Sequence, residues 1–348
     1  MNPYVLTIFL FSLGLGTTLT FASSHWLLAW MGLEINTMAI IPLMAQHHHP
    51  RAVEATTKYF LIQATAAATI LFASTTNAWL TGEWNIMHLS HPIAANTALL
   101  ALALKVGLAP LHFWLPEVLQ GLDLTTGLIL STWQKLAPFA LLIQISHNIE
   151  PTVLILLGIL STLVGGWGGM NQTQLRKILA YSSIAHLGWM IVILQYTPQL
   201  TILALGTYII MTSATFLTFK TNMVTKMNSL ALTWSKNPAI ATMMALTLLS
   251  LGGLPPLTGF MPKWLILQEL TKQGLPAIAT LMALSALLSL YFYLRLCYSM
   301  TLTIAPNTTN SITPWRLTST QSALPLTIFT ILTLMLLPLT PAIVALTY

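Results

Sequence analysis

The stretch GLAPLHFWLP at residues 107–116 decides the fold, because its glycine and prolines interrupt a long apolar segment. The same pattern returns as GLPPLTGFMP at residues 253–262, again inside an apolar segment. Glycine adopts backbone conformations closed to other residues, and proline removes an N–H donor, so both break helices. Corresponding interruptions in the two halves of a membrane chain point to a transport site. The sequence therefore predicts two broken membrane helices beside a transport pathway.

The composition is that of an integral membrane protein. Of the 348 residues, 55% are hydrophobic and 6% are charged, whereas soluble domains average about 25% charged residues. The Lys and Arg residues behind the formal charge of +6 are scattered, so no basic patch for nucleic acid is expected. With about 20 residues per span, we expect an all-α, polytopic fold with about eleven membrane helices, near 3–22, 25–45, 56–80, 94–118, 125–146, 151–170, 178–196, 200–222, 239–268, 276–302 and 323–346.

The distribution of positive charge predicts the orientation in the membrane. Eleven spans place the two termini on opposite sides, and the far side holds only Lys272 outside the spans. Loops on the N-terminal side are expected to hold most Lys and Arg residues: Arg51, Lys58, Arg176, Lys177, Lys220, Lys226, Lys236, Arg295 and Arg316. Positive loops favour the cytoplasm-like compartment, so we expect the N-terminus to face it.

A small group of ionisable residues is expected at membrane depth: Glu34, Lys105, Lys135 and Lys263, together with His112 and His186. A lysine at the bilayer centre costs at least roughly 2.5–3.5 kcal/mol. Lys105 and Lys135 lie too deep in their predicted spans for the side chain to reach an interface easily. These lysines therefore indicate a hydrated path through the interior.

The same residues suit proton transfer. Glu34 is a natural counter-ion for Lys105 or Lys135, because a nearby carboxylate favours the charged form of a buried lysine. If the carboxylate moved away, the lysine would release its proton. Histidines extend such a relay because they change charge near neutral pH. The alternative is that each lysine forms a static ion pair and that His112 only packs against its neighbours.

Several kinds of chemistry are absent from the sequence. It contains no dinucleotide fingerprint, phosphate loop, metal-ligand spacing or nucleophile constellation. Cys297 is the single cysteine, which excludes a disulfide framework and an iron–sulfur cluster held by this chain alone. We therefore expect no metal, NADH, flavin or cluster to bind this chain by itself.

Five segments carry a resemblance to a known family: SSHWLLAWMGLEINTMAIIPL, ALKVGLAPLHFWLPEV, STWQKLAPFALL, GGWGGMNQTQLRKILAYSSIAHLGWM and LLSLGGLPPLTGFMPKW. They resemble the antiporter-like membrane subunits of mitochondrial NADH–ubiquinone oxidoreductase (respiratory complex I), in the vertebrate form. The resemblance runs through nearly the whole chain and weakens near 220–236 and 303–322. The family is also similar to cation/proton antiporters.

The resemblance implies a role in the proton-pumping arm of that complex, in the inner mitochondrial membrane. It implies two inverted, antiporter-like halves at 1–150 and 151–302, followed by a loop and a C-terminal helix at 303–348. Other membrane-arm subunits would be the partners, with NADH, FMN, iron–sulfur clusters and ubiquinone bound elsewhere in the complex. Lys and Arg residues on the matrix side would contact lipids, cardiolipin among them. The N-terminus would face the matrix and the C-terminus the intermembrane space.

The family's functional residues match positions of this chain. The carboxylate of the first half matches Glu34 in GLEIN, and the first broken-helix lysine matches Lys105 in ALKVG. The central lysine matches Lys135 in WQKLAP, and the second broken-helix lysine matches Lys263 in MPKW. His112 and His186 match less specifically.

Two other functions are consistent with the composition. A free-standing proton/cation antiporter would work alone, with an ion-binding carboxylate at its site, whereas the broken helices here carry lysine and no aspartate. A membrane scaffold without transport would tolerate neutral replacement of Glu34, Lys105, Lys135 and Lys263.

Overall fold

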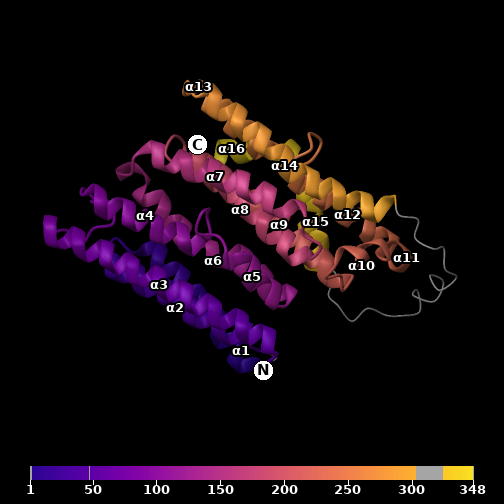
Figure 1. Ribbon diagram of the computed structural model, residues 1–348, viewed down its shortest axis with the longest axis horizontal. Coiled ribbons are helices and arrows are strands. Elements are labelled where there is room, and N and C mark those ends of the chain that lie inside the picture. The colour runs from indigo at the N-terminus through magenta and orange to yellow at the C-terminus, as the bar shows by residue number, and fades with distance from the viewer. Residues whose placement is uncertain (1, 47, 303–323, 348) are drawn as a thin grey trace. The chain divides into compact units, whose positions relative to one another are not determined.

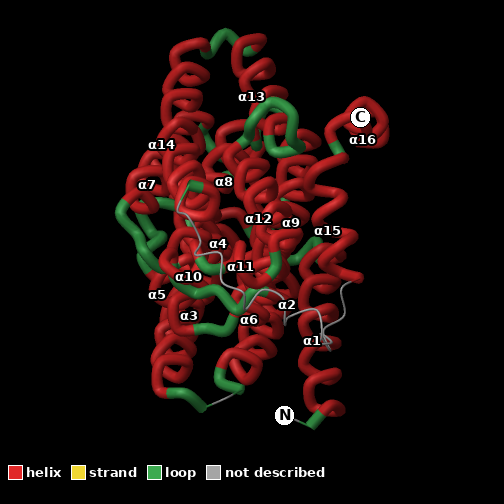
Figure 2. Tube along the Cα trace, turned by 90° about the vertical axis from the view of Figure 1, so that its right-hand side faces the viewer, coloured by secondary structure: helices red, strands yellow, loops and turns green. Residues whose placement is uncertain are grey.

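The computed structural model describes residues 2–46, 48–302 and 324–347. Across these ranges the chain is helical and contains no strand beyond two isolated bridges, so Figure 2 shows helices joined by loops. The all-α fold is confirmed. Arg316 and the loop predicted near 303–322 lie outside the described residues. The chain divides into two compact units, Met1–Leu160 and Ser161–Tyr348.

The first unit is built from consecutive helices that pack side by side (Figure 1). Helix α3 packs on α2, α4 and α5, and α6 packs on α1, α2 and α4. The helices are α1 (Pro3–Ala22), α2 (Trp26–Met44), α3 (Pro50–Thr81), α4 (Pro92–Val106), α5 (Trp114–Gly121), α6 (Leu124–Ile145), the 3₁₀ turn η1 (Ser146–Asn148) and the start of α7 (Pro151–Met170).

In the second unit, α9 packs on α8, α12, α13 and α15, and α14 packs on α12 and α13. Its elements are the end of α7, then α8 (Leu175–Ile193), α9 (Pro198–Thr221), α10 (Met227–Ala231), α11 (Thr233–Lys236), α12 (Pro238–Gly252), α13 (Phe260–Lys272), α14 (Pro276–Thr301), α15 (Leu324–Met335), the 3₁₀ turn η4 (Leu337–Leu339) and α16 (Thr340–Thr347).

Both predicted helix breaks are confirmed. Helix α4 ends at Gly107, with φ of 87°, and α12 ends at Gly253, with φ of 82°. This left-handed conformation is costly for a residue with a Cβ and is the usual end of a helix. The chain then turns through the prolines and resumes as α5 at Trp114 and as α13 at Phe260.

The two units repeat one connection. In the first unit, the loop after α1 pairs with the loop after α3, where Trp26 donates its backbone N–H to Trp84 and Ile86 donates to Ser24. In the second unit, the loop after α7 pairs with the loop after α9 through the isolated bridge between Gln174 and Lys226. The order of elements around each break is therefore similar in the two units.

Length and apolar composition identify fewer spans than expected. Within the described residues, seven helices can each cross a membrane, and an eighth is counted if α15 and the following segment, bent by 65°, form one span. Helices α4 and α12 are apolar but too short by themselves, because the glycine breaks divide them from α5 and α13.

The prediction that the positive residues lie in loops is wrong for seven of them, which are helical: Arg51 and Lys58 in α3, Arg176 and Lys177 in α8, Lys220 in α9, Lys236 in α11 and Arg295 in α14. Helix α3 illustrates the reason. Lys58 forms ion pairs with Glu54 at 2.8 Å and Glu117 at 2.9 Å, so the helix accommodates its charge. Helix α3 has 32 residues, more than the ~20 needed to cross a bilayer.

Candidate functional site

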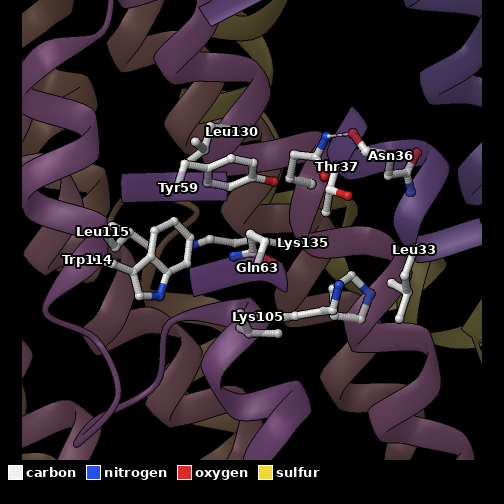
Figure 3. Close-up of a pocket in the computed structure, with 13 residues that line it drawn as sticks. Leu33, Asn36, Thr37, Tyr59, Gln63, Lys105, Trp114, Leu115, Leu130 and Lys135 are labelled. Carbon is white, nitrogen blue, oxygen red and sulfur yellow. Dashed lines mark hydrogen bonds between the residues drawn. The ribbon is translucent and has the colours of Figure 1, made fainter. Parts of the chain in front are cut away.

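Lys105 and Lys135 line one small cavity in the first unit (Figure 3). Lys105 lies in the last turn of α4 and is 5% exposed, and Lys135 lies in α6 and is 2% exposed. The cavity volume is about 10 Å³, which is close to the space that one water molecule needs. The structure thus brings together two of the lysines predicted at membrane depth.

The other cavity walls come from α2 to α6. The polar members are Asn36, Thr37, Tyr59, Gln63 and Gln134, which sequence reasoning missed. Tyr59 and Gln63 stand one turn apart in α3 and are 2% and 4% exposed. A glutamine inside the apolar run YFLIQATAAA was the signal that could have identified this face. Figure 3 shows the Tyr59 hydroxyl directed toward Thr37.

Glu34 lies in α2, one turn from the cavity, as its place in the second predicted helix requires. Its carboxylate accepts a hydrogen bond from the Thr37 hydroxyl at 3.1 Å. Among the described residues, however, Glu34 and Lys105 form no direct ion pair, and Lys105 Nζ has no hydrogen-bond partner. The pair is therefore separated in this structure.

The break after α4 is held by side chains of α5. Trp114 Nε1 donates to the Leu104 carbonyl at 3.0 Å, so an oxygen freed at the end of α4 has a donor. A Cβ at Gly107 would lie 2.8 Å from Leu115 Cδ1, and only glycine leaves room for this contact. Irregular backbone at membrane depth requires such internal partners.

His112 lies inside this break and is buried, with its ring 4.3 Å from that of Phe113 between centroids. It is not among the residues that line the Lys105 cavity. The packing interpretation of His112 therefore stays open beside the relay interpretation.

The second unit places Lys263 and His186 together. Both line a second cavity of about 10 Å³, with Thr207, Met211 and Pro262 among its other walls. Lys263 Nζ donates to the Gly252 carbonyl at 2.8 Å, across the second break. The His186 ring lies 5.7 Å from that of Tyr208. Lys263 also lines an open groove of about 710 Å³ formed mainly by α12, α13 and α14.

The described ranges contain no group of three or more His, Cys, Asp or Glu residues that could hold a metal ion. Cys297 is buried and forms no disulfide. The polar and ionisable groups that line the two cavities are the amines of Lys105, Lys135 and Lys263, the His186 ring, amides and hydroxyls.

Comparison with known proteins identifies the family of this chain. Residues 23–289 match the family described as "NADH:quinone oxidoreductase/Mrp antiporter, TM", and residues 290–344 match "NADH dehydrogenase subunit 2 C-terminus". The NADH-ubiquinone oxidoreductase chain 2 of Carassius auratus is 77% identical over 100% of both chains. That of Salmo salar is 75% identical over 99% of both.

Solved structures share the fold. A chain of respiratory complex I from Thermus thermophilus has a TM-score of 0.86 and 27% identity, over 99% of this chain and 80% of that one. A chain of the Mrp complex from Dietzia has a TM-score of 0.82 at 18% identity, over 95% and 74%, and shows the fold alone. The chain therefore belongs to the NADH-ubiquinone oxidoreductase chain 2 family of antiporter-like membrane subunits.

Proposed function

We propose that this chain is a core membrane subunit of respiratory complex I and that its buried lysines carry protons across the inner mitochondrial membrane. The observation that carries the proposal is the shared, water-sized cavity between Lys105 and Lys135. Two buried amines beside room for water form a proton path rather than a packed core. Electron transfer from NADH to ubiquinone, with FMN and iron–sulfur clusters, occurs on other subunits and drives the transfer.

Glu34 and Lys105 act as the switch of the relay. In this structure the carboxylate is bound by Thr37, and the ammonium stands apart in the cavity. At ~4 Å and an effective dielectric constant of ~20, such an ion pair is worth roughly 4 kcal/mol. A change in neighbouring subunits that alters the Glu34–Lys105 separation therefore loads or unloads the lysine with a proton.

Lys135 is the central relay, because it shares the cavity with Lys105 and lies within α6. Lys263 governs exchange with the far compartment, supported by its position between the His186 cavity and the open groove. His186 assists Lys263 as a proton acceptor. His112, packed in the first break, has the weaker claim to a role.

The proposed topology has eleven spans arranged as two inverted halves. Adding α8 and the two broken pairs, α4 with α5 and α12 with α13, to the eight spans found by length gives eleven. The repeated loop bridges after α1 and α3 and after α7 and α9 support the internal repeat. An odd number of spans from α1 to α6 inverts the second half relative to the first.

The proposed orientation places the N-terminus toward the matrix and the C-terminus toward the intermembrane space, following the asymmetry of the positive charges. Partners are other subunits of the membrane arm. Anionic lipids, cardiolipin among them, contact the positive residues on the matrix side.

Lys105→Met and Glu34→Gln, alone and together, test the switch in the assembled complex. We expect each single change to reduce the protons pumped per electron several-fold, and the double variant to be no worse than the more severe single one, because the two groups act as a unit. Glu54→Gln, a change at an exposed carboxylate of α3, should leave pumping unchanged.

Normal coupled pumping in assembled Lys105→Met would contradict the switch and favour a scaffold role for the chain.

A further inference from the structure

The two helix breaks have the same left-handed glycine, but different side chains pack on it. At the first break, Leu115 packs on Gly107 and Trp114 binds the Leu104 carbonyl. At the second break, Lys263 both packs on Gly253 and binds a carbonyl, that of Gly252, which lies nearer the glycine than the carbonyl bound by Trp114 at the first break. A Cβ at Gly253 would lie 2.9 Å from Lys263 Nζ, 3.0 Å from its Cδ and 3.1 Å from its Cε.

The outer part of the Lys263 side chain therefore rests on the bare α-carbon of Gly253 while Nζ reaches the Gly252 carbonyl at 2.8 Å. That carbonyl belongs to the last residue of α12. The C-terminal end of a helix carries partial negative charge and unpaired carbonyl oxygens, which favour a cation. The end of α12 is thus a seat for an ammonium group.

We propose that Gly253 is a positioning residue for Lys263, which seats the ammonium on the end of α12 between the His186 cavity and the open groove. The inference rests on the proposed role of Lys263 in proton exchange. In addition, proton exchange at Lys263 depends on residue 253 being a glycine, without a Cβ. A Cβ there would push Nζ away from the carbonyl and change how firmly the lysine holds its proton.

Backbone conformation alone does not explain this glycine. Gly274, in the same unit, has φ of 73°, and a Cβ there would meet nothing within 4 Å. Glycine is therefore favoured at this position only by the left-handed backbone of the turn after α13. At Gly253, glycine is favoured both by the left-handed backbone and by the close contact with Lys263. Gly274→Ala is therefore the matched control for Gly253→Ala.

The test uses the whole complex in sealed membranes and compares Gly253→Ala, Gly274→Ala and Lys263→Met. Protons pumped per electron are measured against pH and normalised to the amount of assembled complex. Gly253→Asn and Gly274→Asn form a second pair, because asparagine tolerates positive φ better than alanine. The asparagine pair keeps the comparison informative if alanine impairs assembly.

We expect Gly253→Ala and Gly253→Asn to reduce pumping at least twofold and to move the alkaline fall of the pH profile down by about one pH unit. The sign follows because an ammonium that loses a carbonyl acceptor gives up its proton at lower pH. The Gly274 variants should keep the wild-type profile, since a Cβ at this position meets nothing within 4 Å.

If Lys263→Met abolishes pumping while the Gly253 variants match the Gly274 variants, the positioning role of Gly253 is contradicted and the role of Lys263 in proton exchange is kept. If Lys263→Met pumps normally, the proposed role of Lys263 fails, and the seat fails with it.

Discussion

At the scale of single residues, the two broken helices share a backbone but not a charge pattern. Lys105 precedes its glycine within α4, whereas Lys263 follows its glycine within α13. In the first motif, the position that corresponds to Lys263 is Glu117, which pairs with Lys58 at 2.9 Å. The side-chain donor at the first break is instead Trp114, which binds a different carbonyl of the last turn, that of Leu104.

Replacing Trp114 with phenylalanine should destabilise the complex by roughly 1–3 kcal/mol, because the Leu104 carbonyl loses its donor. The aromatic packing against Tyr59, with ring centroids 5.8 Å apart, is largely kept by phenylalanine. The measurement is the midpoint of thermal unfolding of the purified complex.

Trp264→Phe is the control for this change, since Trp264 is 57% exposed and donates no hydrogen bond among the described residues. Equal midpoints for the two variants would show that the indole N–H contributes nothing to the break.

At the scale of helices, α1 and α2 pack closely through small residues. A Cβ at Gly16 would overlap Asn36 Oδ1 and lie 2.8 Å from the Gly32 carbonyl oxygen. Backbone cannot yield as a flexible side chain can, so Gly16→Ala must move the helices apart. Overpacking of this kind typically costs about 1–3 kcal/mol.

Gly14 gives the matched test, because it lies in the same helix and a Cβ there meets nothing within 4 Å. We expect Gly16→Ala to lower the yield and thermal midpoint of the assembled complex, and Gly14→Ala to equal or exceed the wild type, since alanine favours helix. Indistinguishable variants would mean that α1 and α2 are not in close contact in the complex.

The sequence predicted the helices where local chemistry decides them. The breaks at Gly107 and Gly253 were predictable because a helix rarely continues through a left-handed glycine followed by prolines. Helix α3 starts at Pro50, earlier than the predicted 56, because proline occupies the first turn and the His49 ring accepts the Arg51 backbone N–H. The charged residues Arg51, Glu54 and Lys58 made these first turns look like a loop in the sequence. The bend of 65° after α15 coincides with Pro338, a local signal that the single predicted span over 323–346 passed over.

At the scale of the whole molecule, each unit contains a broken helix and a cavity of about 10 Å³ lined by lysine. The sequence predicted the lysines, because charge in an apolar span is conspicuous. It could not predict which lysines share a cavity, because the walls form where Tyr59 and Gln63 of α3 pack beside Trp114 of α5. The separation of Glu34 from Lys105 was likewise beyond a sequence pattern.

The central claim is that protons pass through the Lys105–Lys135 cavity. The most direct measurement is the number of protons pumped per electron by Lys135→Met in intact membranes, with Lys272→Met, an exposed lysine, as the control. We predict a clear drop for Lys135→Met in fully assembled complex and a wild-type value for Lys272→Met. Unchanged pumping with full activity in Lys135→Met would contradict the claim and reduce these lysines to structural charges.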